Sequence, residues 1–270
     1  MYDDTDNLLV TGRSPDKPVL TDGENSTITR TLNFSVPLLA HEVCHYTALR
    51  DFSALKEKFL SCGAPLPWWI DEELKIIEEK GYKDTYGEMY RASKYFQSEC
   101  WKTAFEAMRG SKLLGGFHFL QFADTDRYEN SNGVVDCFDD ESYVKPDFFL
   151  KFNGERVLLS ELGSRLFYGG DTVIVPISFS DFGEDFEKSA DFSFKLLRKN
   201  GSVCAAGKMP NIDVSKKGLY GICKIKMTLP DVNESEELTL RVKLAINGEI
   251  YSENEWKIWA FEKCAPISYA

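Results

Sequence analysis

The residue group with the most recognisable chemistry lies close together, at positions 41–45. His41-Glu42-Val43-Cys44-His45 matches the pattern H-E-x-x-H. On a helix, this spacing places both imidazoles on one face, where they bind zinc, and the glutamate acts as a base on a zinc-bound water. Asp51 follows His45 by six residues, the position at which some metalloproteases supply a third ligand. A zinc hydrolase is therefore one hypothesis for this chain.

The residues around this motif favour a different interpretation. Pro37 and the apolar run at 36–40 predict a strand buried on both faces rather than the long helix that a zinc motif needs. Position 48 is Ala48 instead of the glycine of the extended motif, and the only other histidine is His118. Short motifs also arise by chance. We therefore expect polar residues at a strand end and no bound metal.

The elements that position these residues form an α/β unit. A Ser cap predicts a helix over 53–60, and Asp71 opens a helical pattern that ends at Gly81. The longest helix is predicted from about Thr85 to Arg109, before a second buried strand over 115–124. Strand, helices and strand in this order predict a parallel pair with a right-handed crossover. The apolar face of the long helix is predicted to contain Met89, Ala92, Phe96, Cys100 and Phe105.

The pattern changes to strands at about residues 142–146. Several segments alternate apolar and polar residues, and Asn-Gly turns follow Lys199 and Ile246. This predicts an antiparallel β-sandwich of about 120 residues. The predicted domains are a loop-rich segment at 1–35, an α/β part at 36–142, the sandwich at 143–263 and a tail at 264–270.

Composition excludes several classes of protein and partner. The chain has 270 residues and a formal net charge of -11, which disfavours binding to nucleic acid. No apolar run reaches the roughly 18 residues of a membrane span, and the acidic N-terminal stretch does not resemble a signal peptide. We therefore expect no membrane association. The sequence does not indicate the cellular compartment. The seven cysteines are dispersed, which predicts reduced, buried thiols.

Three stretches together resemble glycoside hydrolase family 2. They are VPLLAHEVCHY, GGFHFLQFAD and NEWKIWAFEK, and the resemblance runs from about Val36 to about Glu262. It is closest to the β-galactosidase-like and β-glucuronidase-like members found in many bacteria. The resemblance implies a fold of class α/β plus all-β: the last two βα units of a (β/α)8 TIM barrel, followed by an immunoglobulin-like β-sandwich.

The resemblance also implies roles for particular residues. In this family, barrel strand seven ends in a pattern like P-x-x-x-H-E-x-G-Q-Y, and its glutamate is the catalytic nucleophile. Pro37, His41, Glu42 and Tyr46 match it, so Glu42 is the implied nucleophile. Because Glu42 and Asp124 both end strand-like runs, we expect both to face one cleft. The implied substrate-binding residues are His41, His45, Trp68, Trp69, His118, Gln121 and Asp124.

Departures from the family pattern set the functional expectation. Cys44-His45 replaces Gly-Gln, which creates the apparent zinc motif, and Gln121 and Ala123 replace an Asp and a Gln. A whole barrel needs about 250 residues, and nothing before residue 36 supplies the Asn-Glu pair of the acid/base. We therefore expect a fragment of a retaining glycoside hydrolase that acts on carbohydrate without a cofactor. It would be inactive alone and could associate with a missing N-terminal barrel portion. The alternative is a non-catalytic carbohydrate-binding or scaffold module.

Overall fold

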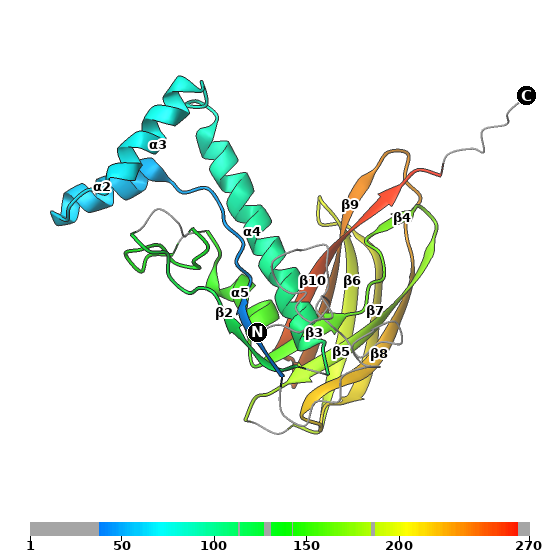
Figure 1. Ribbon diagram of the computed structural model, residues 1–270. Coiled ribbons are helices and arrows are strands. Elements are labelled where there is room, and N and C mark those ends of the chain that lie inside the picture. Colours follow the sequence, from blue (N-terminus) through cyan, green and yellow to red (C-terminus); the bar gives the residue numbers. More distant parts are fainter. Residues whose placement is uncertain (1–37, 113, 127–130, 142, 185–186, 264–270) are drawn as a thin grey trace, which may run out of the picture. The chain divides into compact units, whose positions relative to one another are not determined.

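The chain forms a mixed α/β structure in which sheet predominates. The computed structural model describes residues 38–112, 114–126, 131–141, 143–184 and 187–263 (Figure 1). The loop-rich segment at 1–35, Pro37, Ser142 and the tail at 264–270 with Cys264 lie outside the described residues. The chain divides into two compact units, Met1–Phe149 and Leu150–Ala270.

The described part of the first unit has the predicted order of strand, helices and strand. The elements are β1 (Leu38–Val43), α2 (Phe52–Cys62), α3 (Trp68–Glu79), α4 (Tyr86–Arg109) and β2 (Leu114–Phe119). Strands β1 and β2 pair in parallel, with Ala40 opposite Phe117 and Val43 opposite Phe119, so the parallel pairing is confirmed. Strand β1 continues through the whole of His41-Glu42-Val43, whereas β2 ends earlier than predicted.

Local capping differs from the sequence expectation at α2. Ser53 lies inside this helix, and the cap is Asp51, whose Oδ1 accepts a hydrogen bond from the backbone N of Ala54 at 3.0 Å. A carboxylate at this position satisfies an otherwise unpaired amide and interacts favourably with the helix dipole. The helix ends at Gly63, whose φ of 70° is the left-handed conformation that glycine adopts at low cost.

The two-stranded sheet is buried on one face, which corrects the prediction of burial on both. Helix α4 covers one face: Trp101 packs edge-on against Phe119 with ring centroids 5.8 Å apart, and Phe105 packs against Phe117 at 5.0 Å. In contrast, Leu39 and His41 are exposed. A short apolar run does not itself show whether one or both faces of the strand are covered, because the covering elements come from distant parts of the sequence.

The buried face of α4 also differs from the prediction. Cys100 and Phe105 are buried as expected, but Met89, Ala92 and Phe96 are exposed. The buried side instead carries Lys94, Gln97, Ser98, Trp101, Lys102, Ala104 and Met108. The first half of this helix therefore buries polar side chains while apolar ones face outward.

Helix α5 (Pro146–Asn153) leads into the strands of the second unit. These strands are β3 (Arg156–Ser160), β4 (Leu166–Tyr168), β5 (Thr172–Asp181), β6 (Ser189–Arg198), β7 (Val203–Asp213), β8 (Gly218–Thr228), β9 (Glu236–Ile246) and β10 (Glu249–Phe261). One sheet has the order β4-β10-β9-β6-β7 and the other the order β3-β5-β8. Neighbours are antiparallel except for β4 and β10, which are parallel.

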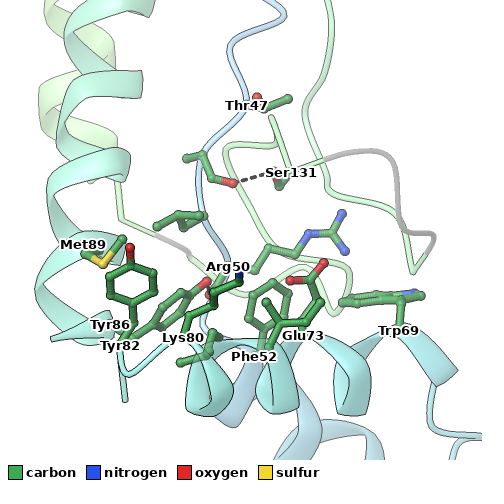
Figure 2. A pocket seen from close by; sticks show the side chains of 14 residues that line it. Thr47, Arg50, Phe52, Trp69, Glu73, Lys80, Tyr82, Tyr86, Met89 and Ser131 are labelled. Carbon is green, nitrogen blue, oxygen red and sulfur yellow. Dashed lines mark hydrogen bonds between the residues drawn. The ribbon is translucent and has the colours of Figure 1, made fainter. Parts of the chain in front are cut away.

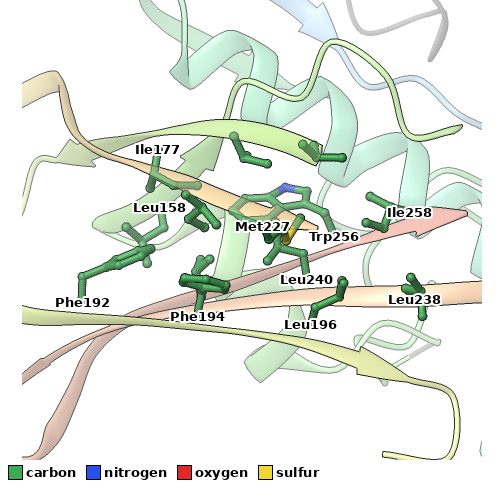
Figure 3. Packing of buried hydrophobic residues seen from close by; sticks show 14 of the residues in the cluster. Leu158, Ile177, Phe192, Phe194, Leu196, Met227, Leu238, Leu240, Trp256 and Ile258 are labelled. Carbon is green, nitrogen blue, oxygen red and sulfur yellow. The ribbon is translucent and has the colours of Figure 1, made fainter. Parts of the chain in front are cut away.

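The two sheets share a hydrophobic core, which confirms the predicted β-sandwich. Figure 3 shows Leu158, Ile177 and Met227 of the three-stranded sheet facing Leu240 and Trp256 of the larger one. Alternate burial along the strands produces this core, since successive side chains of a strand point to opposite faces.

The second Asn-Gly turn closes the β9–β10 hairpin as predicted. Asn247 and Gly248 both have positive φ angles, 52° and 87°. Two residues of positive φ match the right-handed twist of the flanking strands, and Asn-Gly adopts them readily.

Two composition-based expectations can be compared with the described residues. No helix in the described ranges is long and apolar enough to cross a membrane. The six cysteines within those ranges are free thiols, as expected. They are not all buried, however: Cys44 and Cys100 are buried, whereas Cys62 is exposed on α2.

Candidate functional site

The carboxyl edge of the β1–β2 sheet displays Glu42 on a strained backbone. Glu42 and Cys44 have φ angles of 52° and 66°, values that residues other than glycine adopt at a cost. The surrounding fold holds this conformation. Trp101 of α4 donates from Nε1 to the carbonyl of Cys44 at 3.1 Å, and the amide of Leu120 donates to the carbonyl of Val43 at 3.0 Å. Glu42 is partly exposed, so its carboxylate is presented at the strand end without full burial.

Polar side chains from both strands lie at this edge. His41 of β1 and His118 of β2 are exposed, and their rings are 5.1 Å apart. His45 follows β1 and Gln121 follows β2, each by two residues. The Nε2 atoms of His45 and Gln121 are buried and have no hydrogen-bond partner among the described residues. Buried polar atoms are normally paired, so these two nitrogens are exceptions at this edge of the sheet.

The backbone geometry of HEVCH does not match that of a zinc site. The motif requires a helix to align its two imidazoles. Here, His41 to Val43 belong to strand β1, and Cys44 and His45 follow the strand, so no part of the motif is helical. No cluster of three or more His, Cys, Asp or Glu side chains in the described ranges could hold a metal ion.

A pocket, called here the aromatic pocket, lies between the segment after β1 and helices α3 and α4. It has a volume of about 680 Å³. In Figure 2, Trp69 lies at one end, Tyr82 and Tyr86 lie at the other, and Phe52 and Glu73 lie between them. Pockets of 300–1,000 Å³ with mostly apolar walls and a few polar groups are typical of small-molecule sites.

Side-chain packing organises this pocket. The guanidinium of Arg50 lies 4.8 Å from the centre of the Trp69 ring, a cation–π contact. Phe52 packs edge-on against Trp69, with centroids 6.1 Å apart. Tyr86 donates from its hydroxyl to the carbonyl of Arg50 at 3.1 Å, and burial raises the pKa of this hydroxyl. The indole Nε1 of Trp69 donates to the carbonyl of Asp126 at 3.2 Å.

The two neighbouring tryptophans therefore have different environments. Trp69 is buried in the pocket wall, and its ring contacts Arg50 and Phe52. Trp68 is exposed at the start of α3. Tyr82, which was not among the predicted site residues, is 48% exposed and offers a ring to a ligand.

Asp124 lies in a small charged pocket with Arg50 and Lys94, and Glu42 is not part of the lining of this pocket. Its Oδ1 accepts from the backbone N of Gly133 at 2.7 Å. Burial raises the pKa of the Asp124 carboxyl, and the positive charges of Lys94 and Arg50 oppose that change. A Cβ added at Gly133 would lie 2.3 Å from the backbone N of Asp124, so the turn that holds this carboxyl requires glycine.

Sequence reasoning missed Arg50, Lys94, Tyr82 and Tyr86 as site residues. A signal for Lys94 does exist: Lys94, Ser98 and Trp101 recur at helical spacing on the buried side of α4. Apolar periodicity alone selected the opposite face in this half of the helix. Arg50 and the two tyrosines come together only through the tertiary fold.

A family described as "Domain of unknown function (DUF8488)" matches residues 171–262, which lie in the second unit. No curated protein matches the chain.

Several solved structures resemble parts of the chain. A β-D-mannosidase from Dictyoglomus thermophilum is 14% identical, over 65% of this chain and 20% of that one, with a TM-score of 0.44. An exo-chitosanase from Amycolatopsis orientalis is 13% identical, over 66% of this chain and 19% of that one, with a TM-score of 0.44. A β-glucuronidase from glycoside hydrolase family 2 is 10% identical, over 38% of this chain and 11% of that one, with a TM-score of 0.29. In each case the similarity is weak, and this chain spans about a fifth or less of that protein.

Proposed function

We propose that this chain acts on carbohydrate as part of a retaining glycoside hydrolase, with Glu42 as the nucleophile. The observation that carries the proposal is the carboxyl edge of β1 and β2. It holds Glu42 on a strained backbone, and the buried Nε2 atoms of His45 and Gln121 at the same edge have no hydrogen-bond partner among the described residues. Strained backbone is found at functional sites more often than elsewhere. A carboxylate at an edge with unsatisfied hydrogen-bonding groups suits a ligand with many hydroxyls.

The proposal extends to architecture. Strands β1 and β2 would be the last two strands of a (β/α)8 barrel, whose active site lies at the carboxyl ends of its strands. The sandwich that follows would be the immunoglobulin-like domain of the resembled family. A retaining mechanism needs a second carboxyl about 5 Å from the nucleophile, to protonate the leaving oxygen. Asp124 contacts Gly133 and the charged pocket, so this acid/base is proposed to come from outside the described residues.

An activated fluorosugar is expected to label Glu42. In a 2-deoxy-2-fluoroglycosyl fluoride, the Glu42 carboxylate forms a bond to C1 while the C1–F bond breaks, and fluoride leaves without being protonated. The attack therefore needs no acid/base, and the 2-fluoro group slows hydrolysis of the resulting ester. Peptide mass spectrometry is expected to find one fluoroglycosyl group on the peptide that contains Glu42. With aryl glycosides, the purified chain is expected to show no turnover.

Two variants control this experiment. Glu42→Gln is expected to lose the label, whereas Glu72→Gln, at an exposed glutamate of α3, is expected to keep it. If a folded chain remains unlabelled by fluorosugars of the gluco, galacto and manno series, the nucleophile assignment is wrong. If the purified chain hydrolyses aryl glycosides and Glu42→Gln abolishes the hydrolysis, the assignment of Glu42 as nucleophile is supported. The proposal that the acid/base comes from outside the described residues is then wrong.

A second candidate function is carbohydrate binding without cleavage, favoured by the aromatic pocket. Its volume of about 680 Å³ suits a small ligand such as a sugar. Tyr82 presents an accessible ring, and Arg50, Glu73 and Lys80 supply charged groups in the same pocket. Apolar sugar faces pack on such rings, while hydroxyls bond to the polar groups.

Tyr82→Ala is expected to weaken glycan binding in this pocket by about 2- to 10-fold, because an aromatic contact contributes roughly 0.5–1.5 kcal/mol. A glycan array followed by isothermal titration calorimetry measures the change. Glu42→Ala and Tyr168→Ala, the latter at an exposed tyrosine of β4, are expected to bind normally. Loss of binding in Glu42→Ala with retention in Tyr82→Ala would place the sugar at the strand edge instead.

A further inference from the structure

Strand β1 contains one more residue than β2 between two of their paired positions. Between the pairs at Ala40 and Val43, β1 contains His41 and Glu42, whereas β2 contains only His118. This is the residue count of a β-bulge, in which two residues of one strand lie opposite a single residue of the other. Bulges bend the strand and change the direction of its side chains, and they are over-represented next to functional sites.

The imidazoles of His41 and His118 lie together at this bulge. Their ring centres are 5.1 Å apart, and their planes are inclined by 43°. Both residues are exposed, so an ion in solution can reach the pair. The neutral imidazole is the commonest metal ligand among side chains. The two strands therefore present a pair of metal ligands side by side on the uncovered face of their sheet.

The separation of the two rings matches that of two imidazoles on one metal ion. Imidazole nitrogens bind zinc at about 2.0–2.1 Å and the ring centre lies about 1.2 Å farther, so each centre is about 3.2 Å from the ion. At the tetrahedral angle of about 109°, two ring centres are then about 5.2 Å apart, whereas a right angle gives about 4.5 Å. The observed 5.1 Å fits the tetrahedral arrangement. The terminal torsion of histidine is soft, so exposed rings can turn a nitrogen toward a shared ion without movement of the backbone.

We propose that His41 and His118 together bind one divalent transition-metal ion such as Zn²⁺. Imidazole ligands suit zinc, copper and nickel, whereas magnesium and calcium prefer oxygen ligands. No group of three or more His, Cys, Asp or Glu side chains in the described ranges is arranged to hold a metal. The site would therefore have two protein ligands, and its other positions would be open to water or to an oxygen of a ligand.

This site differs from the one that the H-E-x-x-H pattern implies. It takes its second imidazole from His118 of β2 instead of from His45, and it requires two neighbouring strands instead of a helix. It also goes beyond the proposed glycosidase activity, because neither imidazole needs the carboxylate of Glu42 to bind the ion. Failure of the fluorosugar labelling would therefore leave this inference standing.

Titration of the chain, purified without a histidine tag, with ZnCl₂ tests the proposal by isothermal titration calorimetry. We expect saturable binding of one ion per chain, and no saturable binding of MgCl₂. Even an outer partner of a metal ligand contributes 10- to 100-fold to affinity, so His41→Gln and His118→Gln are each expected to weaken zinc binding at least about 10-fold. Cys62→Ser, at the exposed thiol of α2, is the control and is expected to bind zinc like the wild type.

Electron paramagnetic resonance of the chain loaded with Cu²⁺ counts the imidazoles on the metal. Two are expected in the wild type and one in each of the His41→Gln and His118→Gln variants. Both residues are exposed, so both variants are expected to fold, which circular dichroism checks.

Three results would overturn the proposal. The first is the absence of saturable zinc binding by the folded wild-type chain. The second is loss of binding in Cys62→Ser with retention in both histidine variants. The third separates the three histidines of the chain: two imidazoles retained in His118→Gln but only one in His45→Gln would mean that the HEVCH motif binds the metal instead.

Discussion

Replacing Trp256 with alanine is expected to lower the free energy of unfolding of the sandwich by about 3–5 kcal/mol. The Trp256 side chain is 2% exposed in the core between the two sheets, near Leu240 and Met227 (Figure 3). Its removal loses the transfer free energy of a large ring and leaves a cavity that the sheets cannot close, because both are held by their hydrogen-bond ladders. A change of this size raises the unfolded population about 10²- to 10⁴-fold.

Hydrogen exchange measured by mass spectrometry can report this effect for the sandwich separately. Exchange in peptides from β6, β9 and β10 gives the free energy of opening of the second unit alone. A single melting temperature for a chain of two units does not separate the stabilities of the units. Ile174→Ala, at an exposed position of β5, is the matched control and is expected to cost less than about 1 kcal/mol. Similar losses in both variants would contradict the position of Trp256 in the core.

Phe105→Ala is expected to destabilise the first unit by a similar amount, about 3–5 kcal/mol. Phe105 is 0% exposed, and its ring lies 5.0 Å from that of Phe117 and 5.3 Å from that of Phe119. These contacts hold α4 against the β1–β2 sheet. Because Trp101 of the same helix bonds to the carbonyl of Cys44, loosening α4 is also expected to release the strained backbone near Glu42. Labelling of Glu42 by the fluorosugar should therefore fall together with stability.

Phe96→Ala is the matched control on the same helix. The Phe96 side chain is 63% exposed, so its removal is expected to change stability by less than about 0.5 kcal/mol. Hydrogen exchange in peptides from α4 and β2 measures both variants. A loss above 2 kcal/mol in Phe96→Ala would mean that the apolar face read from the sequence is the buried one after all.

The first unit presents three chemically different surfaces. The carboxyl edge of β1 and β2 contains Glu42 and two buried nitrogens without a hydrogen-bond partner among the described residues, and the aromatic pocket presents rings and charged groups. The small charged pocket contains Lys94, which has no hydrogen-bond partner within the described ranges. The labelling and glycan-binding experiments therefore address different residues, and the failure of one leaves the other proposal standing.

Local signals in the sequence determined many of the elements and their order, although α5, β3 and β4 were not predicted. The strand before Glu42, the long helix that ends near Arg109 and the hairpin at Asn247-Gly248 all follow from periodicity, glycine stops and turn chemistry. These signals act over a few residues, so the linear sequence contains them in full. They also place Glu42 at the end of a parallel strand.

Only the tertiary structure decided which faces are buried and which side chains meet. On helix α4, Lys94 is buried and Phe96 is exposed, and Asp124 lines a pocket together with Arg50. The tertiary structure also placed Trp69 in a pocket wall while its neighbour Trp68 remained exposed. The physical reason is that burial depends on what packs against an element from distant parts of the chain, and the hydrophobic pattern within that element does not specify it.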